Sequence, residues 1–152
     1  MNVRDVMTKD VVIVTPDTEV DQIARLLVDN DISGVPVVDV AGRVVGMVTE
    51  GDLIVRNASL HLPHFWQFLD ARFYLEPPRH YEQELRRMLA TVAREIMTEP
   101  VITVGPDEDV RAAATLMVEQ KVNPIPVVEN GQLVGVISRS DIVRLMARPP
   151  AE

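Results

Sequence analysis

The sequence predicts an α/β (α+β) protein made of two copies of one β-α-β-β-α unit, packed together with pseudo-twofold symmetry and separated by a helical insert. Three observations predict this fold. The chain repeats itself, each copy has the same order of apolar strands and amphipathic helices, and an aromatic segment without a counterpart lies between the copies. A unit of about 55 residues is marginally stable alone because it buries too little surface. Packing the two units against each other removes that difficulty.

The duplication can be read directly from the sequence. Residues 4–20, RDVMTKDVVIVTPDTEV, align with residues 94–110, REIMTEPVITVGPDEDV. Two further pairs align in the same order, the second after the loss of one residue from the second copy: ISGVPVV (32–38) with VNPIPVV (122–128), and GMVTEGD (46–52) with GVISRSD (135–141). Matching segments in a fixed order indicate a tandem repeat of one supersecondary unit.

Each copy begins with a short apolar strand, predicted at residues 11–14 and 101–104, and a helix follows it. In the first copy, Asp17 or Thr18 can cap the helix. Its apolar stripe at helical spacing consists of Val20, Ile23, Ala24, Leu27 and Val28. The second helix has the equivalent stripe: Val110, Ala113, Ala114, Met117 and Val118.

A β-hairpin comes next in each copy. In the first copy, residues 35–39 pair with residues 43–49 through Ala41-Gly42. In the second copy, Asn130-Gly131 is a stronger signal for a two-residue turn. A second helix then begins at Thr49 or, in the second copy, at Ser138, which completes the predicted unit.

The insert between the copies is rich in aromatic residues. We place the first unit at residues 1–58, the insert at 59–91 and the second unit at 92–152. The insert holds the only Trp, both Tyr, all three Phe and all three His of the chain. This concentration of aromatic residues favours packing against the repeats or against a second subunit.

The composition excludes several classes of function. The net charge of −8 disfavours nucleic-acid binding, and the absence of Cys excludes disulfides and thiolate metal sites. The N-terminus is too polar for a signal peptide, and no apolar run has membrane-spanning length. We therefore expect a cytoplasmic protein that binds neither nucleic acid nor membrane. We expect no metal site, because Pro63 lies between His61 and His64 and no carboxylate cluster accompanies them. With histidine confined to the insert, acid–base catalysis in the clefts has no obvious agent, and we expect no enzymatic activity.

One motif occurs in both copies at the start of the second helix: Thr49-x-x-Asp52 and Ser138-x-x-Asp141. A hydroxyl residue at the N-cap leaves backbone N–H groups that favour an anion such as phosphate. The carboxylate can accept hydrogen bonds from both hydroxyls of a ribose. The same spacing is also close to a capping box, which only stabilises the helix start. We expect both roles, because the copies also share a distant apolar-Pro-Val segment that capping does not require.

These strings resemble CBS domains, the repeats named after cystathionine β-synthase. The resemblance covers VMTKDVVIVTPDTEVDQIARLLVDNDISGVPVVD, IMTEPVITVGPDEDVRAAATLMVEQKVNPIPVVE and the G-h-h-[ST]-x-x-D motifs that follow them, where h is apolar. It implies a Bateman module, formed by two CBS domains, which commonly dimerises into a flat disc. Two clefts per module can hold AMP, ADP, ATP or S-adenosylmethionine, and no cofactor is required. We expect a stand-alone protein with two CBS domains.

The resemblance also implies roles for individual residues. Asp52 and Asp141 would hold the ribose hydroxyls, and Thr49 and Ser138 would lie beside the phosphate or sugar. Two groups would line the base: Ile32, Ser33, Gly34 and Val35 with Met47 behind them in one cleft, and Val122, Asn123, Pro124 and Ile125 with Val136 in the other. Thr8 and Thr98, from the Met-Thr pairs, would approach from the preceding linker.

The sequence departs from the nucleotide-sensing members of the family in two ways. Some of those members place basic residues just before the apolar-Pro-Val segment, where this chain has Ser33-Gly34 and Asn123-Pro124. The motifs also differ, because Glu50 aligns with Arg139. A guanidinium can pair with a phosphate, whereas a carboxylate repels it. We therefore predict that the cleft with Asp141 and Arg139 binds phosphorylated ligands better.

The predicted function is a regulatory module that senses an adenosine-containing ligand. Its partners would be that small molecule, a second copy in a homodimer and a regulated protein that the sequence does not identify. Two alternatives remain open at this point: a structural dimerisation module with empty clefts, and an enzyme that acts on a nucleotide.

Overall fold

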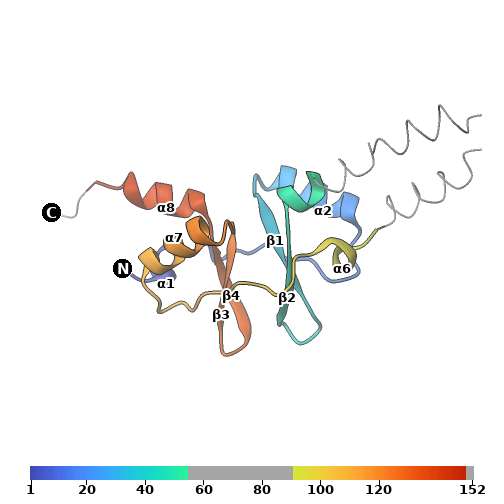
Figure 1. The fold of residues 1–152 in the computed structure, drawn as a ribbon, viewed down its shortest axis with the longest axis horizontal. Coiled ribbons are helices and arrows are strands. Elements are labelled where there is room, and N and C mark those ends of the chain that lie inside the picture. Colours follow the sequence, from blue (N-terminus) through green and yellow to red (C-terminus); the bar gives the residue numbers. More distant parts are fainter. Residues whose placement is uncertain (55–90, 150–152) are drawn as a thin grey trace, which may run out of the picture.

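The computed structural model describes residues 1–54 and 91–149. Figure 1 shows two similar halves side by side, each with a two-stranded sheet covered by helices. This is the mixed α/β architecture that the sequence predicts. The predicted insert at 59–91 lies outside the described residues except for Thr91, so its helices and its aromatic packing stay predictions.

Each half contains one antiparallel hairpin, as predicted. In the first half, β1 (Gly34–Val38) pairs with β2 (Val44–Thr49), and in the second half, β3 (Ile125–Glu129) pairs with β4 (Gln132–Ile137). The second turn has φ values of 52° at Asn130 and 78° at Gly131. Two successive positive φ angles match a type I′ turn, whose twist suits a tight hairpin.

The strands predicted at 11–14 and 101–104 are reduced to one residue each. Val14 bridges Val37 in parallel, and Val104 bridges Val127. The N–H of Val14 donates to the carbonyl of Pro36 at 3.1 Å, but the next rung of this ladder would need an N–H on Pro36 itself. Since proline has no N–H, the pairing cannot extend toward residue 11.

In the first half, the helix after the single bridge begins later than its predicted caps. It is α2 (Val20–Asp29) in the first half, with Glu19 at the N-cap instead of Asp17 or Thr18. The hydroxyl of Thr18 is used by the N–H of Thr15, at 3.0 Å. In the second half, Asp109 caps α7 (Val110–Glu119) by accepting a hydrogen bond from the N–H of Arg111.

The apolar stripes of these helices are narrower than predicted. Ile23 and Leu27 of α2 are buried, but Val28 is 79% exposed and its counterpart on α7, Val118, is 78% exposed. Successive residues of a helix lie about 100° apart, so a residue next to a buried position faces away from the sheet. The two valines therefore lie on the outer surface of the protein.

The last helix of each half starts where the motif predicts. Ser138 is the N-cap of α8 (Arg139–Met146), and in the first half residues 50–54 are helical directly after Thr49. Both motif aspartates therefore lie in the first turn of a helix that follows the hairpin.

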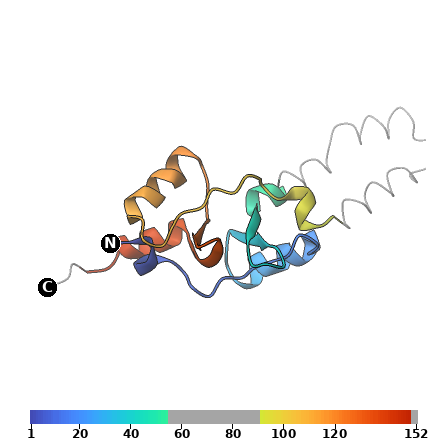
Figure 2. The ribbon, with the colours of Figure 1, turned by 90° about the horizontal axis from the view of Figure 1, so that it is seen from below.

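Two short helices cross from one half to the other. Helix α1 (Val3–Val6) lies at the start of the first copy but packs beside α7 and α8, whereas α6 (Ala93–Ile96) packs beside β2 (Figures 1 and 2). Backbone hydrogen bonds fix both crossings, from Val3 to the carbonyl of Glu108 at 2.9 Å and from Ala93 to that of Thr18 at 2.9 Å.

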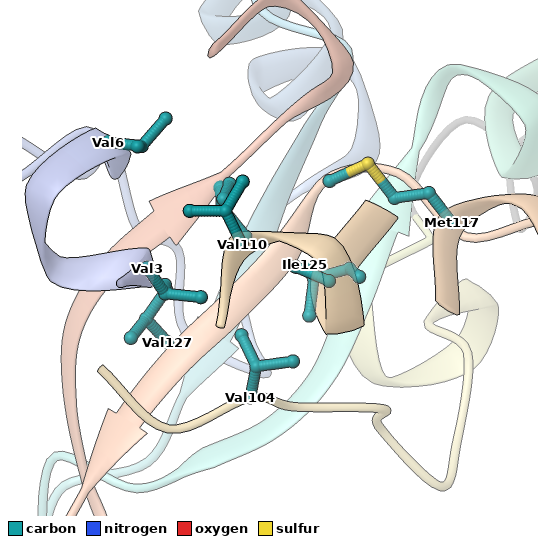
Figure 3. Close-up of a cluster of buried hydrophobic side chains, with 9 residues drawn as sticks. Val3, Val6, Val104, Val110, Met117, Ile125 and Val127 are labelled. Atoms are coloured by element: carbon teal, nitrogen blue, oxygen red, sulfur yellow. The ribbon is translucent and has the colours of Figure 1, made fainter. Parts of the chain in front are cut away.

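The crossed helices complete the two hydrophobic cores. Val3 and Val6 of α1 lie in the core of the second half, together with Val110 of α7 and Val127 of β3 (Figure 3). Ala93 of α6 lies in the core of the first half. Each copy therefore supplies one turn of helix to the core of the other copy, which makes the two halves depend on each other.

At the surface, ion pairs also connect each crossed helix to the half that it packs against. Arg4 of α1 pairs with Glu129 of the second half at 2.6 Å, and Arg94 of α6 pairs with Asp17 of the first half. The carboxylate of Glu129 raises the pKa of Arg4 above its ordinary value, chiefly through the side-chain hydrogen bond. These pairs are exposed, so they orient the helices more than they stabilise the fold.

Candidate functional site

The second motif forms a complete capping box. The backbone N–H and the hydroxyl of Ser138 donate to Oδ2 of Asp141 at 2.9 Å and 3.1 Å, and the N–H of Asp141 donates back to the Ser138 hydroxyl at 3.2 Å. Asp141 is 5% exposed. The predicted capping role is therefore confirmed, and it uses one of the two carboxylate oxygens.

The first motif has the same geometry in a more open setting. The N–H and hydroxyl of Thr49 donate to Oδ2 of Asp52 at 2.9 Å and 3.2 Å. Asp52 is half-buried. Both motif aspartates thus present Oδ1 away from their own cap.

The Met-Thr pairs bring a hydroxyl from the opposite copy to each carboxylate. Thr8 donates to Oδ1 of Asp141 at 3.0 Å, and Thr98 donates to Oδ1 of Asp52 at 3.2 Å. Backbone bridges position the threonines, since Thr8 pairs with Val136 and Thr98 pairs with Met47. The structure therefore joins predicted site residues from the two copies into two equivalent clusters.

Glycines in β2 and β4 allow this crossing. A Cβ on Gly135 would lie 2.6 Å from Sδ of Met7 and 2.9 Å from the carbonyl oxygen of Thr8. A Cβ on Gly46 would clash in the same way with Met97. The glycine of the G-h-h-[ST]-x-x-D motif and the methionine of the Met-Thr pair are thus one packing unit, in which the linker passes directly over the strand.

A cavity of about 650 Å³, which we name the Thr8 cavity, is lined by Thr8 and Ser138 of the Thr8–Asp141 cluster, whereas the buried Asp141 is not among its lining residues. Its walls come from both copies, from the linker, from the start of β1 and from the start of α8. The lining residues are Thr8, Asp10, Val11, Val12, Asn30, Asp31, Ile32, Ser33, Gly34, Pro36, Glu50, Asn123, Pro124, Val136, Ser138, Arg139, Ser140 and Arg144.

On the other side of the pseudo-twofold axis, two smaller cavities correspond to the Thr8 cavity. The Thr98 cavity, of about 330 Å³, is lined by Met47, Thr49, Asp52, Thr98, Pro100, Val101, Ile102, Gln120, Lys121, Val122, Asn123 and Pro124. The axial cavity, of about 390 Å³, is lined by Ser33, Thr49, Glu50, Gly51, Met117, Lys121, Val122, Asn123 and Arg139. Most lining residues of the Thr8 cavity are the repeat counterparts of residues in one of these two.

The structure groups the predicted base-lining residues differently from our prediction. Ile32, Ser33 and Gly34 share the Thr8 cavity with Val136 and not with Met47. In turn, Val122, Asn123 and Pro124 share the Thr98 cavity with Met47. The predicted partition was wrong because it kept each cleft within one copy, whereas the linkers and hairpins meet across the boundary.

Val35 and Ile125 lie in the cores and not on the cavity walls. Both are fully buried, and Ile125 packs with the cluster around Val3. Side chains alternate along a strand, so Gly34 and Pro36 face the Thr8 cavity while Val35 faces the opposite side. Pro36 is accordingly a lining residue that the sequence analysis missed, although alternation was enough to find it.

Near the pseudo-twofold axis, residues at equivalent positions of the two copies contact each other: Ser33 contacts Asn123, and Gly34 contacts Pro124. The side-chain amide of Asn123 donates to the hydroxyl of Ser33 at 3.1 Å, and its carbonyl oxygen accepts from the N–H of Arg139 at 2.8 Å. A Cβ on Gly34 would lie 2.8 Å from Cδ of Pro124. Gly34 is therefore fixed by the close approach of the two copies.

Charged residues near the axis correct our prediction about the two clefts. Glu50 and Arg139 both line the Thr8 cavity, and both line the axial cavity. They cannot give one cleft a carboxylate and the other a guanidinium, so the premise of the predicted preference is wrong. Arg144 pairs with Oδ1 of Asp141 through one terminal nitrogen, at 2.6 Å.

Two charged residues of the cavity walls were not predicted from the sequence. Asp10 and Asp31 line the Thr8 cavity, where their repeat counterparts on the other side are Pro100 and Lys121. Alignment of the two repeats could have identified both residues, because Asp10 aligns with Pro100 and Asp31 with Lys121, and the charge differs within each pair.

Sequence comparisons place this arrangement among known proteins. The profile described as CBS domain matches residues 3–58 and 93–148. MJ1426 of Methanocaldococcus jannaschii is 30% identical, over 96% of this chain and 91% of its own length. CBSX1, a chloroplastic CBS domain-containing protein of Arabidopsis thaliana, is 30% identical over 93% of this chain, which spans only 62% of that protein.

A solved structure has the same fold. The crystal structure of CBSX2 in complex with AMP superposes with a TM-score of 0.72 at 27% identity, over 96% of each chain. In the described parts of our structure, we find no helix both long and apolar enough to cross a bilayer.

Proposed function

Because this chain belongs to the CBS domain family, we propose that it binds an adenosine-containing ligand in the Thr8 and Thr98 cavities and acts as a regulatory sensor of that ligand. One observation carries the proposal: in the wall of each cavity, a threonine hydroxyl donates to the motif carboxylate of the opposite copy. Asp52 itself lines the Thr98 cavity, whereas the buried Asp141 contacts Thr8 and Ser138, which line the Thr8 cavity. A ligand that engages both groups would respond to the arrangement of the two halves.

The chemistry of the cavities suits a nucleoside. Asp52 keeps Oδ1 outside the capping box and lines the Thr98 cavity, where ribose hydroxyls can replace or join the hydroxyl of Thr98. Oδ1 of Asp141 accepts from Thr8 and Arg144, so a ribose bound there would take the place of one of these donors. Apolar side chains such as Val11, Val12 and Pro36 form a wall for a flat base. The volumes of about 330 Å³ and 650 Å³ fall in the range of small-molecule sites.

AMP is the first ligand to test, because CBSX2 binds it in its crystal structure and matches this chain over nearly its whole length. ATP and S-adenosylmethionine contain the same adenosine unit and are the further predicted ligands. We expect no required cofactor, since the proposed ligand is the signal itself.

Sensing would follow from the crossed linkers. A ligand shifts an equilibrium only by its difference in affinity for two arrangements. Here the hydroxyl and the carboxylate belong to different copies, so a ligand held by both stabilises the arrangement in which they are close. A regulated protein would then bind that arrangement preferentially. We expect this module to act by binding, without catalysis, in the cytoplasm.

Calorimetric titration of AMP into the purified chain tests the proposal. We expect saturable binding that disappears when Asp52→Asn and Asp141→Asn are combined. Asparagine keeps one acceptor oxygen for the helix cap, so the variant should remain folded. AMP at 100 times its Kd should also stabilise the native chain by about 2.7 kcal/mol. Chromatography of the incubated mixture should recover AMP and ATP unchanged, because turnover would indicate an enzyme.

A structural module without a ligand is the alternative. The burial of Asp141 and its ion pair with Arg144 favour it, because a carboxylate with these partners already has a structural role. This alternative predicts no heat of binding and no thermal stabilisation by AMP, ATP or S-adenosylmethionine. The titration above therefore separates the two functions.

We also propose that the protein forms a homodimer through its outer helices. Val28 and Val118 are exposed at equivalent positions of α2 and α7, and Ile54 and Val143 are exposed at equivalent positions of the helices that follow the hairpins. Exposed apolar side chains at equivalent positions of several helices indicate an interaction surface. Light scattering at micromolar concentration should give the mass of two chains.

A further inference from the structure

The two sides of the axis differ in charge at one equivalent position. Asp31 lines the Thr8 cavity, and its counterpart Lys121 lines both the Thr98 and the axial cavities. Each residue directly follows the last turn of a helix and has a left-handed backbone, with φ of 51° at Asp31 and 54° at Lys121. Because the backbone geometry is the same, the two side chains leave the chain in equivalent directions.

Lys121 lies where the Thr98 and axial cavities meet. Thr49, Val122 and Asn123 also line both cavities, whereas Asp52, three residues beyond Thr49, lines only the Thr98 cavity of these two. A ribose held by Asp52 thus has the axial cavity on its Thr49 side. A 5′-substituent that extends in that direction passes the ammonium group of Lys121.

The axial cavity suits an anionic substituent. Its charged lining residues are Lys121, Arg139 and Glu50, so cations exceed anions. Across residues 1–54 and 91–149, no hydrogen bond or ion pair engages the side chain of Lys121. Its ammonium group can therefore turn toward a phosphate without breaking an internal contact.

The Thr8 cavity has the opposite balance. Asp10, Asp31 and Glu50 line it, against Arg139 and Arg144. Arg144 is already paired with the buried carboxylate of Asp141. A phosphate placed here meets three carboxylates against two guanidinium groups, one of which already neutralises Asp141, and like charges in a partly enclosed site repel strongly.

We infer that the two nucleoside sites divide ligands by charge, an inference that rests on the proposed function. The Thr98 cavity, extended by the axial cavity, takes a nucleoside 5′-phosphate through Lys121. The Thr8 cavity takes an adenosine compound that carries no phosphate. Lys121 and Asp31 are the residues that determine this specificity.

Calorimetric titrations of AMP and of adenosine test the inference, because the two ligands differ only in the phosphate. The full chain should bind one AMP tightly and two adenosine molecules. Lys121→Asn should weaken AMP binding about tenfold or more and change adenosine binding less than about twofold, because it removes a charge-assisted contact to phosphate alone. Asparagine tolerates the left-handed conformation, so the backbone is preserved.

Asp31→Asn is the matched control, since it removes a charge at the equivalent position. It should leave the tight AMP site unchanged, and Asp31→Lys should create a second AMP site. Equal losses of AMP and adenosine in Lys121→Asn, or two equivalent AMP sites in the unaltered chain, would overturn the division by charge while the sensor function stands. If neither ligand binds the unaltered chain, the proposed function fails as well.

Discussion

The hydroxyl of Thr8 donates a hydrogen bond of 3.0 Å to the carboxylate of Asp141, 133 residues further along the chain. The equivalent bond from Thr98 to Asp52 is longer, at 3.2 Å, and more exposed. The second carboxylate is therefore held more firmly by the opposite copy than the first. This difference leads to a direct test of the crossed linkers.

Replacing Thr8 with valine should destabilise the ligand-free protein by about 1 kcal/mol, the net value of one hydrogen bond. Valine keeps the branched shape of threonine, so packing should change little. Thr98→Val should cost less, because its bond is longer and solvated. Urea unfolding of both variants measures the two losses, and equal losses would argue against the asymmetry.

Placing a side chain on Gly135 should disturb the linker that crosses β4. Gly135→Ala puts a Cβ within 2.9 Å of the backbone oxygen of Thr8, and overpacking of this kind typically costs about 1–3 kcal/mol. Gly51→Ala is the control, because its nearest neighbour would be at an ordinary 3.5 Å. Hydrogen exchange at the amide of Thr8 should become faster only in the first variant.

The core of the second half should weaken when α1 is altered. Val3 is fully buried there, so Val3→Ala should lower the free energy of unfolding by about 2 kcal/mol. Val40 is fully exposed, and Val40→Ala should stay within about 0.5 kcal/mol of the unaltered chain. Chemical denaturation followed by circular dichroism compares them. A neutral Val3→Ala would mean that α1 does not complete this core.

The homodimer should depend on the exposed valines of α2 and α7. We expect the double change Val28→Glu and Val118→Glu to give monomers in light scattering, because charges at an apolar interface must be desolvated. Val40→Glu should leave the dimer intact, since Val40 lies next to the hairpin turn. A dimer that survives the double change would place the interface elsewhere.

Stability should depend on pH through the cap of α7. Hydrogen bonds from Arg111 lower the pKa of Asp109 from 3.8 to about 2. A lowered folded pKa gives a stabilisation that is fully present above the unfolded pKa and is lost as the pH falls through the folded pKa. Asp109→Asn should therefore be less stable than the unaltered chain at pH 7, with a difference that shrinks below about pH 4 and vanishes only below about pH 2. Thermal melts across this range would show it, and a constant difference would contradict it.

Local features of the fold were predictable from sequence because their signals are local. The Asn130-Gly131 turn and the helix start at Ser138 follow from residue chemistry within a few positions. Strand alternation also separates Pro36, which faces the Thr8 cavity, from Val35, which faces the core. The cap at Thr18 failed because a competing partner, Thr15, lies equally near in sequence.

The crossing of the linkers was not predictable, because nothing near Met7 or Met97 specifies which copy each will contact. Only the three-dimensional fit of Met7 over Gly135 does so. The same limit explains the wrong partition of the clefts and the wrong use of Glu50 and Arg139. Relations between copies depend on packing over long sequence distances, and a single sequence contains no direct signal for them.

The exchange of α1 and α6 also has a consequence for synthesis on the ribosome. When residue 54 has emerged, the first half still lacks Ala93, which fills its interior only much later in translation. Val3 and Val6 are synthesised first, but they can be buried only after Val110 and Ile125 have been synthesised. The nascent chain therefore carries an unfinished first half until the second is nearly complete, and this interval is when chaperones would find exposed apolar surface.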